Sequence, residues 1–101
     1  DVGCGIGAWL AQWKKHGISD VVGLDGSYVD RSRLLIDPSD FQTTDLEQGF
    51  QLDRKFDLVE CLEVAEHLDE SHADALVECI AAHSDTVLFS AAVPSQGGLI
   101  T

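Results

Sequence analysis

The sequence predicts an α/β fold, an open sheet of mostly parallel strands with helices on both faces. Short apolar segments that suit buried strands alternate with amphipathic segments that suit helices, and this alternation is typical of a parallel sheet covered by helices. A glycine-rich turn at residues 3–7 and two acidic residues that follow strand segments, Asp25 and Asp45, support the same fold. At 101 residues we expect one domain, residues 1–101.

The first half of the chain contains one clear helix, which we expect at residues 8–16. Trp9 and Trp13 lie one helical turn apart, and with Leu10 they predict an apolar stripe that packs into the core. Gly17 suits the position just after the end of this helix.

Two strands follow, at residues 21–24 and 41–44, and each ends at one of the two acidic residues. Between them, Ser27 is expected to cap a short helix that ends at residue 35. Pro38 prevents that helix from running further.

The second half continues the alternation, with strands expected at residues 56–61 and 86–93. Between them a helical segment begins near Glu63, and Ser71 caps a second helix that ends at residue 83. The apolar face of that second helix is formed by Ala75, Leu76, Cys79 and Ile80. Surface or capping roles are expected for the histidines near helix ends, His16, His72 and His83.

The charge of the chain limits the classes of partner that this segment is expected to bind. Against 18 aspartates and glutamates there are 6 lysines and arginines, a net charge of −12, which repels phosphates and argues against nucleic acid or an anionic membrane as the partner of this segment. No apolar run is long enough to span a membrane. The 3 cysteines are widely spaced and lack a CxxC pair, so we expect reduced thiols in a cytoplasmic protein.

The segment Asp1-Val2-Gly3-Cys4-Gly5-Ile6-Gly7 carries the first functional signal. Its glycines allow backbone conformations with positive φ and the close approach of a ligand. The helix that follows directs free N–H groups and its positive dipole end toward such a ligand. A glycine turn that binds nothing and simply joins a strand to a helix fits the same residues.

Acidic residues at strand ends add a second signal. In dinucleotide-type folds, an acid about 20 residues after the glycine turn accepts hydrogen bonds from the ribose hydroxyls. Asp25 occupies that position, and Gly26 leaves room for the base. Asp45 suits the adenine amine, and Leu46 suits the face of its ring. Both acids also suit plain turns.

The stretch FDLVECLEVAEHL, residues 56–68, makes the interpretation more specific. Together with the glycine turn, Asp25 and the Asp45-Leu46 pair, it resembles the class I S-adenosylmethionine (SAM)-dependent methyltransferases. The similarity is greatest to the group with "FDLV…EVxEHL" after the fourth strand, which includes ubiquinone-pathway O-methyltransferases. The resemblance implies a Rossmann-like sheet of class I methyltransferase topology and methyl transfer from SAM, with S-adenosylhomocysteine as product, to an unidentified acceptor that we expect to be a small molecule.

The resemblance also implies roles for individual residues. Asp1 and the glycine turn would hold the methionine part of SAM, and the backbone at Cys61 and Leu62 would face its amino group and sulfonium. A site lined by acids suits a sulfonium cation better than a pyrophosphate. The implied cofactor-binding residues are Asp1, Gly3, Cys4, Gly5, Gly7, Asp25, Gly26, Asp45, Leu46, Cys61 and Leu62.

Three residues of the EVAEHL stretch, Glu63, Glu66 and His67, have the spacing of one helix face near the mouth of such a site. His67 suits a general base acting on an acceptor hydroxyl. The three side chains also suit a divalent metal, as in relatives with an E-x-x-E-H arrangement, or a plain charged helix face. The loop at residues 94–98 borders the acceptor in the family.

The resemblance implies an incomplete domain, cut short at both ends. The strand before Asp1 and the last two strands of the family's sheet fall outside the sequence, so we expect the chain alone to be poorly stable, with strand edges left unpaired. Two other functions stay open beside methyl transfer. One is an NAD-type oxidoreductase domain, since Gly3, Gly5 and Ala8 fit the looser dinucleotide fingerprint; the other is a non-catalytic SAM-binding remnant.

Overall fold

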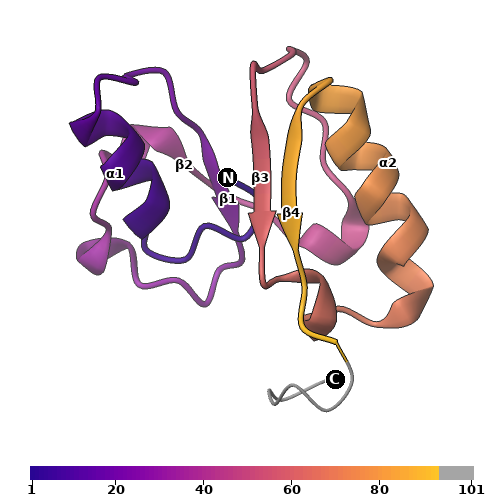
Figure 1. Cartoon of the computed structure of the whole chain (residues 1–101). Coiled ribbons are helices and arrows are strands. Elements are labelled where there is room, and N and C mark those ends of the chain that lie inside the picture. Colours follow the sequence, from indigo (N-terminus) through magenta and orange to yellow (C-terminus); the bar gives the residue numbers. More distant parts are fainter. Residues whose placement is uncertain (94–101) are drawn as a thin grey trace. The chain divides into compact units, whose positions relative to one another are not determined.

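A computed structural model describes residues 1–93 of the chain (Figure 1). The chain divides into two compact units, Asp1–Asp45 and Leu46–Thr101. In the part that the structure describes, each unit holds one α-helix and one pair of strands, and both pairs are parallel. Parallel strands joined through helical segments agree with the predicted α/β class. The strands nevertheless form two separate two-stranded sheets among the described residues, where the sequence predicts one open sheet.

The first unit begins with the glycine turn and helix α1, Ala8–Lys15. The helix starts directly after Gly7 and ends at Lys15, and the backbone N–H of the capping residue His16 donates to the carbonyl oxygens of Gln12 and Trp13 at 3.1 Å. Lysines in the last turn suit the negative end of the helix dipole. The predicted helix at residues 8–16 is thus confirmed to within one residue.

Strand β1, Gly23–Asp25, pairs in parallel with strand β2, Phe41–Thr43. On the other side of β1, Val2 forms a parallel bridge with Leu24. The Leu24 carbonyl oxygen accepts the Gly3 N–H at 2.7 Å. The first residues therefore pair as the tip of a strand, as the sequence predicts.

The core of the first unit packs α1 and the following loops against β1 and β2. Gly23 allows this close packing, because a Cβ there would lie 2.7 Å from Cys4 Sγ and 3.0 Å from Leu10 Cδ1. The buried residues of the core cluster are Cys4, Leu10, Val21, Val29, Ile36 and Phe41.

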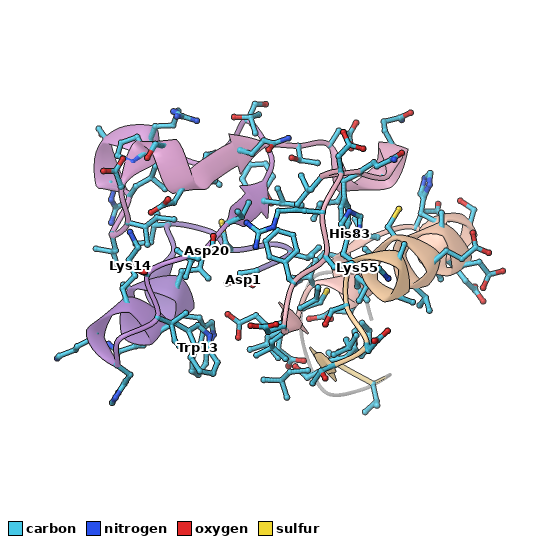
Figure 2. All side chains as sticks on the ribbon, turned by 90° about the horizontal axis from the view of Figure 1, so that it is seen from above. Asp1, Trp13, Lys14, Asp20, Lys55 and His83 are labelled. Carbon is cyan, nitrogen blue, oxygen red and sulfur yellow. The ribbon has the colours of Figure 1, made fainter. Side chains whose placement is uncertain are left out.

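Two predictions for this unit are wrong. Trp9 is 58% exposed, and Trp13 is also exposed (Figure 2). Leu10 is the buried residue of α1, so the predicted stripe does not enter the core as a whole.

The predicted helix from Ser27 to residue 35 is replaced by tight turns. The Asp30 carboxylate accepts the Ser32 N–H at 3.0 Å and starts a short 3₁₀-helix, η1, Arg31–Arg33. Asp37 does the same before η2, Pro38–Asp40. Because the Asp30 side chain supplies a hydrogen bond locally, the chain turns at η1 where a continuous helix was expected, and η2 lies beyond the predicted end of that helix.

In the second unit, strand β3, Val59–Leu62, pairs in parallel with strand β4, Val87–Ser90. Both strands are shorter than predicted. Helix α2, Ala73–His83, lies between them in sequence and alongside the pair in Figure 1. It buries Leu76 and Ile80, two residues of its predicted apolar face.

The start of α2 differs from the sequence prediction. Ser71 does not cap the helix with its side chain. Asp69 accepts the Ser71 N–H at 2.9 Å and starts a 3₁₀-helix, η5, Glu70–His72, that leads into α2. Two further 3₁₀-helices of this unit are η3, Leu46–Gln48, and η4, Ala65–His67.

His83 at the end of α2 is buried, where a surface or capping role was expected (Figure 2). Its Nδ1 lies 2.6 Å from the Cys79 carbonyl oxygen, and its Nε2 accepts the Leu52 N–H at 3.0 Å. This pattern requires a neutral ring with its proton on Nδ1. The ring also stacks near Phe50, with centroids 5.0 Å apart. One side chain thus ties the loop before β3 to α2.

We predict that His83→Ala lowers the free energy of unfolding by about 2–3 kcal/mol, because it leaves a buried backbone N–H unpaired and a gap beside Phe50. Urea unfolding followed by circular dichroism measures the change. The exposed His16→Ala variant serves as control and should stay within about 0.5 kcal/mol of the parent. Equal stabilities of the two variants would contradict the structural role of His83.

Candidate functional site

The glycine turn adopts a backbone that requires glycine. Gly3, Gly5 and Gly7 have φ values of 79°, 55° and 88°, all in the left-handed region that other residues rarely enter. At Gly7 an added Cβ would also lie 2.9 Å from the Ile36 side chain. The turn is closed by a 2.9 Å hydrogen bond from the Gly7 N–H to the Cys4 carbonyl oxygen. The positive φ values predicted for these glycines are confirmed.

Asp25 lies at the carboxyl end of β1 and is buried against this turn. Its Oδ2 accepts the Gly5 N–H at 2.7 Å, and its Oδ1 accepts the Gly26 N–H at 2.8 Å. The structure therefore brings together two of the predicted site residues, the acid and the glycine turn, within one unit. A carboxylate bonded to two backbone N–H groups is held in one orientation.

Tyr28 completes the surroundings of Asp25, and sequence reasoning did not identify it. Its hydroxyl donates to Asp25 Oδ1, and its ring lies over Gly26, where an added Cβ would be 2.7 Å from Tyr28 Cδ1. Desolvation of the phenol, together with the hydrogen bond to Asp25 and the charge of Asp25, raises the pKa of Tyr28 to about 12. The sequence feature that could have indicated this contact is the position of Tyr28, three residues after Asp25.

Cys4 in the turn is a packing residue. Burial, followed by the negative charge of Asp25, raises the pKa of the Cys4 thiol to about 11. The thiol is therefore protonated at neutral pH and is a poor nucleophile.

The other predicted residues of the first unit lie around the same strand ends. Asp1 pairs with β1 through its backbone, and its side-chain Oδ2 is buried. Asp45 is exposed and follows β2 closely, where the Thr44 N–H donates to the Asp25 carbonyl oxygen at 2.8 Å. Leu46 starts η3 in the second unit and is half-buried.

In the second unit, the predicted backbone contacts lie at the tip of β3. Cys61 is fully buried, and burial followed by the charge of Glu66 raises the pKa of its thiol to about 11. Leu62 ends the strand, and the Glu63 N–H donates to the Ser90 carbonyl oxygen at 2.9 Å. The side chain of Cys61 therefore belongs to the core, which leaves its backbone for any ligand.

The predicted shared helix face of Glu63, Glu66 and His67 is wrong. Glu63 has a left-handed backbone with φ of 55°, so no helix passes through it, and η4 covers only Ala65–His67. Within this turn the side chains separate: that of Glu66 is 5% exposed, and that of His67 is 49% exposed.

Glu66 and His67 still form a pair. Glu66 Oε1 lies 3.6 Å from His67 Nε2, an ion-pair distance if the imidazole is protonated. Glu66 Oε2 is buried without a hydrogen-bond partner among residues 1–93. A buried carboxylate oxygen in this state favours a nearby cation or donor.

The geometry of Glu63, Glu66 and His67 does not support the hypothesis that these three side chains bind a divalent metal. Such a site needs three ligands on one face, and among residues 1–93 no three His, Cys, Asp or Glu side chains gather closely enough to hold a metal ion. The predicted acceptor loop at residues 94–98 lies outside the described residues.

We predict that Asp25→Asn lowers the pKa of Tyr28 from about 12 toward its ordinary value near ~10. Because the folded-state pKa is raised, the stabilisation from this bond is present below about pH 10 and is lost as the pH rises toward 12. Tyr28 is the only tyrosine, so absorbance at the tyrosinate band reports it alone. Asp30→Asn, in the same loop, should leave the titration unchanged; an unshifted midpoint in Asp25→Asn would refute the assignment.

Comparison with known proteins identifies the family. A family model described as a methyltransferase domain matches residues 1–93. No curated protein and no solved structure matches the chain. Among residues 1–93, no helix has the length and apolar character needed to cross a membrane. The match covers the glycine turn, Asp25 and the tip of β3, and the chain therefore belongs to the methyltransferase-domain family.

Proposed function

We propose that this methyltransferase domain uses SAM as methyl donor and transfers the methyl group to a small-molecule acceptor. The observation that carries the proposal is the hydrogen bond between the Gly5 N–H and Asp25 Oδ2 at 2.7 Å. It places an anchored carboxylate at the carboxyl end of a parallel strand, beside a glycine turn and a helix N-terminus. Ligands of open α/β sheets bind at such strand ends.

The proposed roles are those that the family resemblance implies, and the contact between Asp25 and the glycine turn supports them. Asp25 binds the ribose hydroxyls, and the space over Gly26 receives the adenine. The backbone of residues 3–7 and Asp1 hold the methionine part. The family resemblance further implies that Asp45 and Leu46 contact the adenine edge and that the backbone at Cys61 and Leu62 faces the methionine amino group. Bound SAM supplies a methyl group activated by a sulfonium.

Electrostatics supports SAM over NAD as the ligand. In dinucleotide-binding turns, backbone N–H groups face the pyrophosphate. Here the Gly5 N–H is already bonded to the Asp25 carboxylate, whose negative charge lies at the turn. A pyrophosphate would find this N–H donor occupied, whereas a sulfonium cation needs no donor. The net charge of −12 acts in the same direction.

The Glu66–His67 pair suits general-base catalysis on an acceptor hydroxyl. With Nε2 facing Glu66, Nδ1 of His67 is the nitrogen that takes the acceptor proton, and the buried carboxylate stabilises the resulting imidazolium. His67 is exposed enough to reach an acceptor, and Glu66 is not. Glu66 thus acts as a positioning residue.

The first prediction of this proposal concerns the cofactor. In parallel calorimetric titrations, S-adenosylhomocysteine should bind and NAD should not. Asp25→Asn should weaken S-adenosylhomocysteine binding about 10- to 100-fold, because hydrogen bonds to a charged group are worth about 1.5–3 kcal/mol. Asp30→Asn, whose carboxylate only caps a surface turn, should bind like the parent. Binding of NAD alone would overturn the proposal.

The second prediction concerns catalysis. With labelled SAM and a panel of small hydroxyl-bearing acceptors, His67→Ala should lower kcat by about 10²–10⁴-fold while binding of S-adenosylhomocysteine stays unchanged. His72→Ala is the matched control, since His72 also lies 3.7 Å from a glutamate, Glu47, and should keep full activity. A kcat unaffected by His67→Ala would exclude the base role. Cofactor binding without turnover of any acceptor would favour a non-catalytic SAM-binding domain.

A further inference from the structure

Tyr28 is held at the surface by two contacts. The residue is 80% exposed, yet its hydroxyl donates to Asp25 Oδ1 and its ring covers Gly26. Gly26 has no side chain, which leaves the space that the ring fills, because any Cβ there would collide with it. The exposed side chain of Tyr28 is therefore held in place by its hydrogen bond to Asp25 and by the contact of its ring with Gly26.

The two parts of Tyr28 offer the chemistry of a nucleoside. Its hydroxyl gives Asp25 a donor of the kind that a ribose hydroxyl provides, and its ring gives the surface over Gly26 a flat aromatic face. These are the two places that the proposed function gives to the ribose and the adenine. A ligand with both groups and Tyr28 therefore compete for the same carboxylate oxygen and the same space.

We propose that Tyr28 is an internal substitute for the nucleoside part of the ligand: it occupies Asp25 and Gly26 in the free protein and must leave both when the ligand binds. This inference rests on the proposed function, since it takes Asp25 as the ribose-binding acid. It makes Tyr28 a residue that sets cofactor affinity through a competing closed conformation.

The backbone allows such a movement without refolding. The Val29 N–H donates to the Gly26 carbonyl oxygen at 3.2 Å, and the Val29 side chain lies in the core of the first unit. The turn that carries Tyr28 is therefore anchored on both sides. Rotation of the exposed side chain alone breaks the bond to Asp25 and uncovers Gly26, and solvent then receives the phenol.

Two hydrogen bonds of Asp25 remain after Tyr28 leaves. The bonds from the Gly5 and Gly26 N–H groups still orient the carboxylate. Only the hydroxyl of Tyr28 is exchanged for a hydroxyl of the ligand. Desolvation of the phenol, followed by its hydrogen bond to Asp25, raises the pKa of Tyr28 to about 12, so the phenol keeps the proton that it donates to Asp25 at neutral pH.

The energetic consequence is a lowered apparent affinity. If the closed conformation is populated about nine times in ten, the dissociation constant is raised about tenfold over that of the open protein. Tyr28→Phe removes the hydroxyl that competes for Asp25 and keeps a ring of the same shape. Its affinity for a ligand with ribose hydroxyls should rise by up to this factor.

The test measures binding of S-adenosylhomocysteine, adenosine and 2′,3′-dideoxyadenosine to the full chain by calorimetry. Tyr28→Phe should bind all three about 5- to 10-fold more tightly than the parent, because each places its adenine where the Tyr28 ring lies and so needs the open conformation. The dideoxy compound should bind most weakly to both proteins, since it has no hydroxyl to place on Asp25. Ser27→Ala, in the same turn, is the matched control and should bind all three like the parent.

A second measurement follows Tyr28 directly. The chain has 1 tyrosine, so labelling with 3-fluorotyrosine gives a single fluorine resonance, which should move on addition of S-adenosylhomocysteine. Weaker binding by Tyr28→Phe, or equal binding together with an unmoved resonance, would overturn the inference while the parent still binds S-adenosylhomocysteine and the proposed function stands. If neither parent nor variant binds S-adenosylhomocysteine or adenosine, the proposed function itself fails, and this inference with it.

Discussion

The hydrogen-bonded carboxylate of Asp25 is the constraint on which the first unit depends. It joins the end of β1 to the glycine turn through Gly5 and to the following turn through Gly26. A buried carboxylate without such donors would be costly, and the Gly5 donor lies in a turn whose glycines adopt positive φ values. The strand end, the turn and the start of α1 therefore fix one another, and the ligand site that we propose is the surface of this arrangement.

Residues whose local chemistry decides their conformation could be predicted from the sequence. The glycine turn, α1, β1, β2 and the buried side of α2 follow from positive φ, periodicity and apolar content. The predicted bounds of these elements are close to the observed ones, because few contacts outside each segment oppose its local conformational preference. The meeting of the acid with the glycine turn was also predictable, since adjacent parallel strands end at the same edge of a sheet.

Two failed predictions, the helix from Ser27 to residue 35 and the Ser71 cap, share a physical cause, which is side-chain capping at short range. An aspartate two residues before a serine accepts the serine N–H in three places, at Asp30, Asp37 and Asp69, and each time a 3₁₀-helix follows. Helical spacing alone does not reveal these turns. The face of α1 and the exposure of β4, whose Val87, Leu88 and Phe89 are all exposed, depend on tertiary packing and were equally out of reach.

The buried polar side chains of the chain differ in how many of their hydrogen bonds the fold supplies. This difference distinguishes side chains with a structural role from those with a proposed functional role. Both ring nitrogens of His83 are bonded to backbone, so its role ends with the fold. Asp25 is satisfied too, yet one of its three donors is an exposed side chain that a ligand is able to replace. Glu66 has an oxygen that no described residue satisfies. Because unpaired or exchangeable positions persist only where something else compensates for them, Asp25 and Glu66 are the groups around which we expect the chemistry of this domain to be organised.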